Sequence, residues 1–245
     1  MAEPVIRERE SLDPAEFCAL FEACFGKTVD ANYFQWKFEA SPAGKALHVA
    51  AEADGRLAGL VNFMPSRFVL NGVEFFTCQG ADVMVHPDFQ RRGLLTSMTR
   101  LANERMVERG WRFIVNFTGE VLHSTYLKLG HHHLFDLQRW GTTYRVTTAS
   151  RLLRRVLGAN ASPGLDATFD ERFDDVWQRT SGGRGVAQVR DRAYLSWRYE
   201  QRPDRKYRLL TEEANGVLHG FAILRGPFLV DLWGEDDPAV VARLV

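Results

Sequence analysis

The chain has 245 residues, of which 45% are hydrophobic and 25% charged, which is typical of a globular protein with one large or two small domains. Its 31 Lys and Arg residues balance 31 Asp and Glu residues, so net charge favours neither nucleic acid nor a membrane surface as a partner. The odd number of cysteines (Cys18, Cys24 and Cys78) and the lack of an apolar leader or a long apolar run predict reduced thiols in a cytoplasmic protein.

The N-terminal residues predict a strand followed by a helix. Residues 5–9 alternate weakly and indicate the strand. Ser11 or Asp13 is expected to cap the helix, because Pro14 favours the first helical position. Gly26 is expected to end it.

The next segment predicts a short helix and two hairpins. Residues 33–39 form an aromatic helical pattern. Asp54-Gly55 and Asn71-Gly72 are typical of tight hairpin turns. The strands expected around these turns cover residues 46–53, 57–63, 67–70 and 73–78.

A strand, a turn and a helix are expected over residues 81–109. The run Val83-Met84-Val85 predicts the strand, and apolar residues at helical spacing from Leu94 predict the helix. Between them lies a basic corner, Gln90-Arg91-Arg92-Gly93. The free N–H groups at a helix start suit a phosphate or pyrophosphate, and the arginines add positive charge. The alternative interpretation is an amphipathic helix with a basic first turn.

The chain then predicts a buried strand and a second helix. Residues 111–117 have little polarity, as expected of a strand buried on both faces. Residues 121–129 predict a short helix that ends at Gly130, and residues 134–146 have further strand character.

An internal repeat links the two halves of the chain. Residues 33–63 align without a gap with residues 194–224, and ten of the 31 positions are identical, several times what unrelated sequences give. Tyr33 matches Tyr194 and Trp36 matches Trp197. A helix expected over residues 170–179 precedes the second copy much as another precedes the first.

The second copy is incomplete. After a predicted strand over residues 228–233, the chain turns at residues 234–238 without a basic, glycine-containing corner. We therefore expect a catalytic domain over residues 1–148, a helix and linker over 149–168, and a structural or substrate-shaping unit over 169–245.

The pattern from Val83 to Leu95 resembles motif A of the GNAT superfamily of acyl-CoA-dependent N-acyltransferases. Gln90 and Gly93 match this motif, whereas Leu95 stands where the family usually has a small residue. The resemblance implies an α/β (α+β) fold with a mixed, mostly antiparallel twisted sheet flanked by helices. Residues 169–245 would form a second, partial GNAT-like unit.

The resemblance also implies an activity. It predicts transfer of an acetyl group from acetyl-CoA to a primary amine by direct attack in a ternary complex. No metal is expected. The partner would be a small-molecule amine, without nucleic acid or membrane, and the protein a monomer or homodimer.

The family scheme assigns roles to residues at matching positions. Backbone N–H groups of Val83, Met84 and Val85 would bind the pantetheine arm and polarise the thioester carbonyl. Tyr126 would protonate the leaving thiolate, since its pKa is near that of a thiol. The corner that binds the pyrophosphate would comprise Gln90, Arg91, Arg92, Gly93, Leu94 and Leu95.

Three further polar residues are candidates for the site. Asn116 and Ser124 are expected near the pantetheine, although a buried Asn bonded to backbone explains Asn116 nearly as well. Asp82 is a candidate general base acting through water, with Glu120 or a water chain as alternatives. Among aromatic residues, Trp36, Phe135 and Trp140 are candidates to line the acceptor site.

Structural explanations are simpler than metal binding for His131-His132-His133 and simpler than a nucleophilic role for Cys78. Adjacent strand residues point to opposite faces, so three consecutive histidines cannot converge on one ion, and a surface turn is expected. Cys78 is expected to be a small buried apolar residue.

Two other functions remain open at this point. The chain could be a non-catalytic tandem GNAT-like module that binds a ligand or partner, because Leu95 departs from the motif and the second copy is truncated. It could also be a Fem-type aminoacyl transferase. The balanced charge gives no support for the charged tRNA that such enzymes use.

Overall fold

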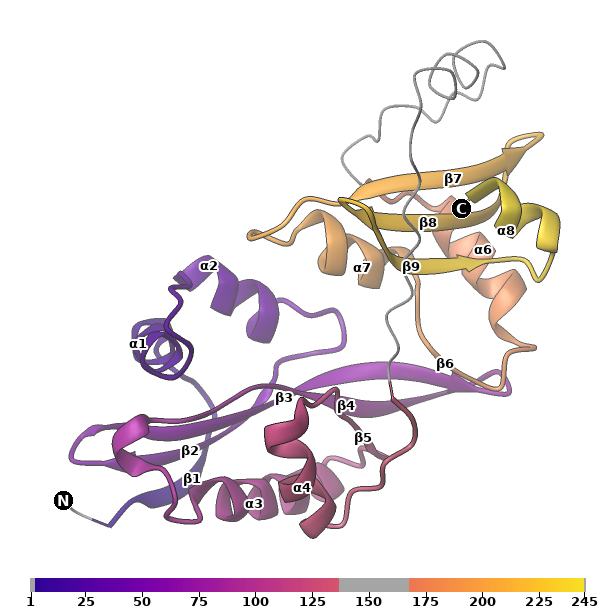
Figure 1. Ribbon diagram of the computed structural model, residues 1–245. Coiled ribbons are helices and arrows are strands. Elements are labelled where there is room, and N and C mark those ends of the chain that lie inside the picture. Colours follow the sequence, from indigo (N-terminus) through magenta and orange to yellow (C-terminus); the bar gives the residue numbers. More distant parts are fainter. Residues whose placement is uncertain (1–2, 137–167, 245) are drawn as a thin grey trace.

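The computed structural model describes residues 3–136 and 168–244, which form a six-stranded and a three-stranded sheet (Figure 1). The larger sheet has the order β1-β2-β3-β4-β5, and β6 pairs with the distal part of β3. All its pairs are antiparallel except β4 with β5, so the predicted mixed, mostly antiparallel sheet is confirmed. Its strands are β1 (Val5–Arg9), β2 (Leu47–Ala53), β3 (Arg56–Leu70), β4 (Val73–Val85), β5 (Ile114–Val115) and β6 (Val186–Gln188).

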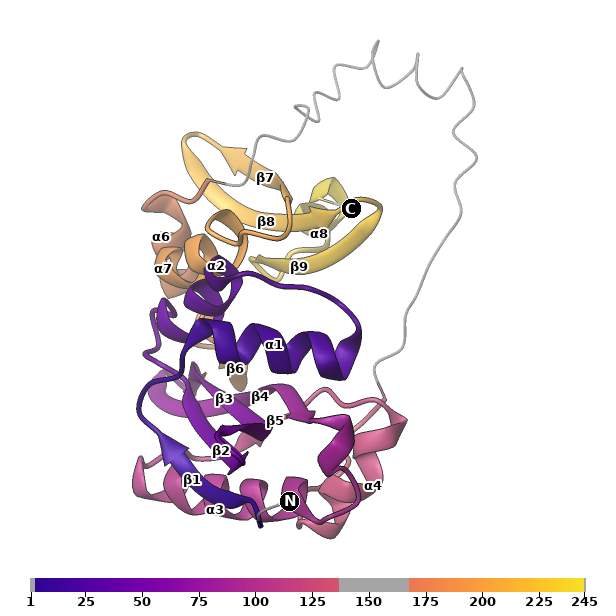
Figure 2. The same ribbon diagram turned by 90° about the vertical axis from the view of Figure 1, so that its left-hand side faces the viewer.

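Helices cover both faces of this sheet (Figures 1 and 2). One face packs against α1 (Pro14–Phe25), α2 (Ala31–Phe34) and the π-helical turn η1 (Gln35–Glu39). The other face packs against α3 (Leu94–Glu108), which follows the 3-10 turn η2 (Pro87–Phe89). Successive residues of β3 alternate between the two cores: Leu60 joins the first and Val61 the second. In residues 3–136, the last helix is α4 (Glu120–Lys128).

The first helix begins and ends as its sequence predicts. The Asp13 side chain accepts a hydrogen bond from the Ala15 N–H (2.8 Å), so Asp13 and not Ser11 is the cap. Gly26 ends the helix in the left-handed conformation, with φ 63°.

The predicted strands merge into two long ones. The expected strands 57–63 and 67–70 belong to β3, and 73–78 and 83–85 belong to β4, so the predicted interruptions are wrong. Pro65 does not break β3, because it lies between the last residue paired with β2 (Phe63) and the first paired with β6 (Phe68). At Pro65, β4 is therefore the only described strand beside β3, and proline is tolerated where a strand has no partner on one side.

The strand expected over residues 111–117 is much shorter than predicted. Only Ile114 and Val115 pair with β4, and both are half-buried, because β5 is an edge strand. The prediction of a strand buried on both faces is therefore wrong. Residues 134–136 are not a strand either, and 137–146, with most of the predicted linker, lie outside the described residues.

The C-terminal part contains the second sheet, of order β7-β8-β9. The helix before the repeat runs over Arg172–Ser181 rather than 170–179, and a terminal helix that the sequence reading did not include follows β9. The elements are α6 (Arg172–Ser181), α7 (Arg192–Leu195), the π-helical turn η3 (Ser196–Glu200), β7 (Arg208–Ala214), β8 (Val217–Arg225), β9 (Phe228–Gly234) and α8 (Pro238–Leu244).

The repeated sequences adopt the same local structure. Asp30 and Asp191 each accept a hydrogen bond from the N–H three residues later and start a short helix that continues as a π-helical turn. The hairpins that follow carry a register shift at equivalent places, Ala51/Glu52 and Glu212/Glu213. The interpretation of residues 169–245 as a partial GNAT-like unit stays a prediction.

Candidate active site

The outer edge of β4 loses its neighbour halfway along. The pairing of β4 with β5 ends at Gln79 and Val115. One residue later, the Gly80 N–H donates to the side-chain oxygen of Asn116 (3.2 Å), and a Cβ at Gly80 would clash with that oxygen. From residue 81 to 85, β3 is the only strand paired with β4 in the described part of the chain. Asn116 therefore marks the point where this edge opens.

A β-bulge lies in the open part of β4. Leu60 pairs with Met84 and Asn62 with Ala81, so Asp82 and Val83 both lie opposite the single residue Val61. Asp82 has a positive φ of 42°, which costs a non-glycine residue about 1–3 kcal/mol. Surrounding contacts must therefore hold it.

Asn62 supplies those contacts from β3. Its side-chain Nδ2 donates to the carbonyl oxygens of Ala81 (3.3 Å) and Asp82 (3.0 Å). The peptide bonds of the described residues are trans, so each N–H points opposite to the carbonyl of its own peptide. The N–H groups of Asp82 and Val83 therefore both point away from Asn62.

The amides of the predicted run Val83-Met84-Val85 do not all face the same way. The His86 N–H donates to the Ala58 carbonyl of β3 (2.9 Å), so strand alternation directs the Met84 N–H toward β3 and those of Val83 and Val85 toward the open edge. The Met84 side chain is buried. The thiol of Cys24, on α1, lies beside the Val85 N–H: burial raises the pKa of Cys24, and this N–H opposes the rise.

The predicted phosphate corner lies between η2 and α3. Gln90, Arg91, Arg92 and Gly93 are exposed, and Arg91 and Gly93 have positive φ (61° and 75°). Gly93 caps α3 without a side-chain hydrogen bond from the described residues, and the space where its Cβ would stand is open. The Gln90 side chain donates to the Val85 carbonyl (3.3 Å) and ties the corner to the open edge. This backbone fits an anion such as a pyrophosphate.

The two leucines of the corner turn inward. Leu94 is buried, and Leu95 is half-buried and packs against the core between α3 and the sheet. The side chain that departs from the motif is thus directed into the protein interior and leaves the backbone of the corner accessible.

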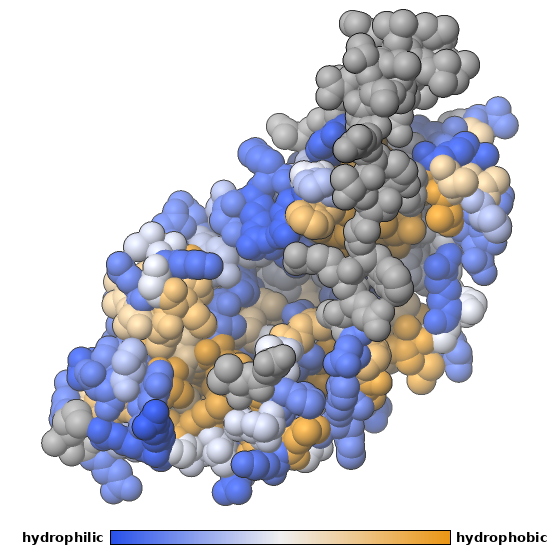
Figure 3. Space-filling model, in the orientation of Figure 1, coloured by the Kyte–Doolittle hydropathy of each residue, from blue (hydrophilic) through white to orange (hydrophobic). Residues whose placement is uncertain are grey.

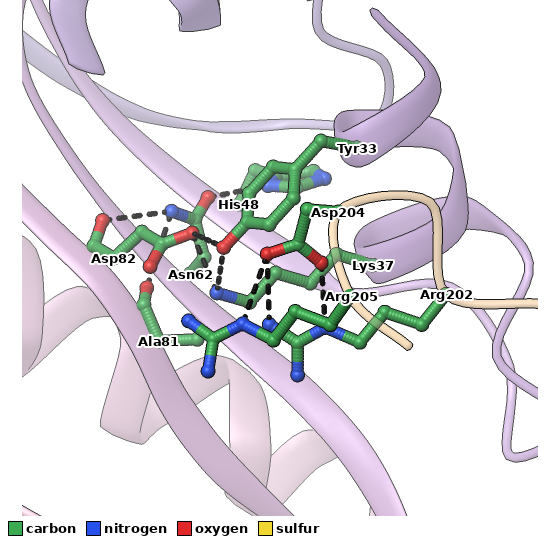
Figure 4. Close-up of polar contacts among 9 residues, drawn as sticks. All are labelled: Tyr33, Lys37, His48, Asn62, Ala81, Asp82, Arg202, Asp204 and Arg205. Atoms are coloured by element: carbon green, nitrogen blue, oxygen red, sulfur yellow. Dashed lines mark hydrogen bonds and ion pairs between the residues drawn. The ribbon is translucent and has the colours of Figure 1, made fainter. Parts of the chain in front are cut away.

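The carboxylate of Asp82 is ion-paired (Figure 4). Lys37 Nζ lies 2.7 Å from its Oδ2 and donates to the Tyr33 hydroxyl (2.8 Å), which in turn lies 3.4 Å from the same oxygen. The Lys37 and Asp82 side chains are 14% and 16% exposed. Burial lowers the pKa of Lys37 although Asp82 opposes this, and burial raises the pKa of Tyr33. Sequence reasoning missed both partners, although Tyr33 and Lys37 stand one helical turn apart.

The C-terminal part faces this cluster. The loop between η3 and β7 carries Arg202, which pairs with Asp204 (2.6 Å) and lies 4.8 Å over the Trp36 ring. Burial is the largest cause of the lowered pKa of Lys37, and the charge of Arg202 lowers it further. Strongly hydrophilic side chains gather over this loop (Figure 3). Trp36 is itself buried, and Phe135 is 66% exposed; Trp140 lies outside the described residues.

Tyr126 and Asn116 meet through His131. The Tyr126 ring is buried and packs 4.8 Å from the His131 ring, and the Asn116 amide nitrogen lies 3.4 Å from His131 Nδ1. Burial raises the pKa of Tyr126. Ser124 is exposed on α4, and the structure does not describe the Glu120 side chain. The sequence reading placed His131 in a surface turn and missed this contact.

The histidine triplet and Cys78 do not converge on one site. His133 packs on His123 (5.1 Å), while His131 faces Tyr126. Within the described ranges, no group of three or more His, Cys, Asp or Glu side chains is arranged to hold a metal ion. Cys78 is fully buried beside Met106, and burial raises its pKa to about 12.

The sequence model of the Acetyltransferase (GNAT) domain family matches residues 5–133. The chain belongs to the GNAT acetyltransferase domain family. The match includes the open edge of β4, the corner at 90–95 and Tyr126. No curated protein matches this GNAT chain by sequence.

Solved structures share the GNAT fold at low identity. A probable N-acyltransferase of unknown function from Enterococcus faecalis is 14% identical with a TM-score of 0.63, over 91% of this chain and 55% of that one. The Saccharomyces cerevisiae N-myristoyltransferase with bound myristoyl-CoA is 11% identical with a TM-score of 0.50, over 96% and 59%. A Trypanosoma brucei acetyltransferase is 18% identical with a TM-score of 0.46, over 57% of this chain and all of its own.

This GNAT chain thus spans little more than half the length of the first two proteins. Among the described helices, none combines the length and apolar character needed to cross a membrane.

Proposed function

We propose that this protein is an N-acyltransferase that moves an acetyl group from acetyl-CoA to a primary amine of a small-molecule acceptor. The observation that carries the proposal is the continuity of two features on one segment. An open strand edge with outward-pointing amides (Asp82, Val83, Val85) leads within a few residues to an exposed helix start with two arginines.

Acetyl-CoA would supply an activated acetyl thioester and a diphosphate group by which the protein binds it. The corner residues Gln90 to Leu95 bind the diphosphate, with the first-turn N–H groups of α3 and the side chains of Arg91 and Arg92 as donors. The edge amides of β4 bind the pantetheine arm as an added strand, and Asn116 and Ser124 lie beside it.

The transfer needs a polarised carbonyl, a neutral amine and a protonated leaving group. The Asp82 and Val83 N–H groups hold the thioester carbonyl. The Asp82 carboxylate accepts the proton of the attacking amine through water, and Tyr126 donates its phenolic proton to the departing sulfur. We propose direct attack of the amine on the thioester in a ternary complex, with no nucleophile supplied by the protein.

The C-terminal unit shapes the acceptor site and does not bind the donor. Between β9 and α8, where the first unit has its basic corner, the chain has Glu235-Asp236-Asp237, and this charge repels a phosphate. The loop with Arg202 and Asp204 faces the Asp82 cluster. We expect residues 1–148 to be the catalytic domain of a cytoplasmic monomer or homodimer.

A ligand-binding module without catalysis is the second candidate. It is favoured by the ion pair of Asp82 with Lys37, whose ammonium group sits at the carboxylate that an acceptor amine would need.

Calorimetry followed by a thiol-release assay tests the proposal. We expect the wild-type protein to bind coenzyme A, acetyl-CoA and desulfo-coenzyme A, and to release thiol when acetyl-CoA is supplied with a panel of amino sugars, polyamines and amino-acid amides. Binding without thiol release for any amine would favour the module. Absence of binding would refute the acyltransferase and leave the module, with a ligand other than coenzyme A, as the better candidate.

A further inference from the structure

Asn62 and His48 form a buried polar pair beneath the bulge of β4. Asn62 is 0% exposed and His48 is 1% exposed. Their side chains meet at Asn62 Oδ1 and His48 Nδ1, 2.7 Å apart. Because the Asn62 nitrogen already donates to the carbonyls of Ala81 and Asp82, its oxygen faces His48, and His48 Nδ1 must carry the proton.

His48 is oriented by aromatic packing. Its ring stacks on Phe34 (5.9 Å, 21°) and meets the edge of Phe38 (5.5 Å). Its other nitrogen, Nε2, is buried and has no hydrogen-bond partner among the described residues. Burial lowers the pKa of His48, so the ring is neutral. Within the described part of the chain, the ring hydrogen-bonds to Asn62 alone, so the ring is oriented for that contact.

The repeat provides an internal comparison. The positions equivalent to His48 and Asn62 in the second copy are Leu209 and Ile223, on the corresponding strands β7 and β8. Ile223 is fully buried, and Leu209 packs against the same core. The scaffold therefore accepts an apolar pair at these two positions, and stability alone does not require the polar pair of the first copy.

We propose that Asn62, held by His48, is a positioning residue that aims the N–H groups of Asp82 and Val83 at the acyl carbonyl. This inference rests on the proposed acyl transfer. Asn62 binds the carbonyls of two successive peptides, and each of those peptides carries one of the two N–H groups. Without the Asn62 donors, the carboxylate of Asp82 keeps its ion pair with Lys37, but the two peptide planes lose the hydrogen bonds that fix them and are free to turn.

The predicted effect separates chemistry from donor binding. The corner at residues 90–95 is held by its own backbone and by α3, and coenzyme A lacks the acyl carbonyl that the Asp82 and Val83 amides bind, so its affinity should depend little on Asn62. Polarisation of the thioester carbonyl should depend on it. Loss of one donor from an oxyanion-binding site typically lowers kcat by about 100- to 1,000-fold.

The test uses two variants and two measurements. The double variant His48→Leu/Asn62→Ile installs the pair that the second copy carries, and Asn62→Asp keeps the shape but removes the donors. Asn215→Asp, in the exposed turn between β7 and β8, is the matched control, since the first copy has Asp54 at the equivalent position. Calorimetry measures binding of coenzyme A, and infrared difference spectroscopy measures the carbonyl stretch of acetyl-CoA labelled at the carbonyl carbon.

We expect wild type and control to lower the carbonyl frequency of bound acetyl-CoA. Both Asn62 variants should bind coenzyme A within about twofold of wild type but lose this shift, and lose about 100-fold or more in kcat with any amine that wild type acetylates. An Asn62 variant that binds coenzyme A and retains the shift and kcat would overturn the inference alone. Wild type that fails to bind acetyl-CoA would overturn the proposed function and the inference together.

Discussion

Trp36 and Trp197 form a reciprocal pair at the junction of the two repeats. The indole N–H of Trp36 donates to the Trp197 carbonyl (2.6 Å), and the indole N–H of Trp197 donates to the Trp36 carbonyl (2.8 Å). The rings stack with centroids 5.6 Å apart. The two residues are 161 positions apart, which is the offset of the repeat, so equivalent residues contact each other as they would across a two-fold axis.

This pairing predicts coupled losses of stability. Trp36→Phe or Trp197→Phe should each cost about 1–3 kcal/mol of unfolding free energy, because each leaves a buried carbonyl without its donor. The loss of unfolding free energy in the double variant should differ from the sum of the two single losses, since both hydrogen bonds depend on one stacked interface. Urea unfolding measures this, with Trp111→Phe as a control outside the interface. Additive losses would argue against coupling between the repeats.

The basic corner predicts a specific loss of donor affinity. Arg91→Ala/Arg92→Ala should weaken coenzyme A binding by about 10- to 100-fold, because two charge-assisted contacts to the diphosphate disappear. Arg100→Ala/Arg112→Ala removes the same formal charge from exposed positions and should leave affinity nearly unchanged. Calorimetry at two salt concentrations separates local contacts from general attraction. Equal losses in both double variants would rule out the corner as the site.

Tyr126→Phe should lower kcat by about 100-fold or more and leave coenzyme A affinity unchanged, because only the proton donor is removed. Burial raises the pKa of Tyr126 above its ordinary value of about 10. The phenol therefore keeps its proton through neutral and mildly alkaline pH, and its ionisation should reduce kcat only above about pH 10. A pH profile of wild type and variant tests this. A fall in wild-type kcat that begins at a lower pH and is absent from the variant would contradict the expected pKa of Tyr126.

Cys24 should report occupancy of the strand edge. Its thiol lies beside the Val85 N–H, where the pantetheine arm is expected, whereas Cys18 is partly accessible elsewhere on α1. Burial raises the pKa of both thiols, so alkylation should be slow near neutral pH. Peptide mass spectrometry should show that acetyl-CoA slows alkylation of Cys24 and leaves the alkylation rate of Cys18 unchanged. Equal alkylation of Cys24 with and without acetyl-CoA would place the pantetheine elsewhere.

Local patterns in the sequence were sufficient for much of the fold. The start of α1 at Pro14, the hairpin turns, the strand and corner before α3 and the repeat could all be predicted, because turn residues, caps and periodicity act over a few neighbouring positions. The same patterns ended the predicted strands too early, at residue 63 in β3 and at residue 78 in β4, although the two strands continue through Pro65 and Gly80. Beside Pro65, β4 is the only neighbour of β3 among the strands that the structure describes, and β3 continues there because its other side has no strand to pair with in those residues.

By itself, the sequence determined the family, the basic corner and the internal repeat. Tertiary structure decided which polar groups meet: Asn62 with the bulge of β4, Lys37 with Asp82, and Trp36 with Trp197. These partners are separated by 20, 45 and 161 residues. Strand register and helix packing bring them together, and neither is encoded within a short stretch of chain.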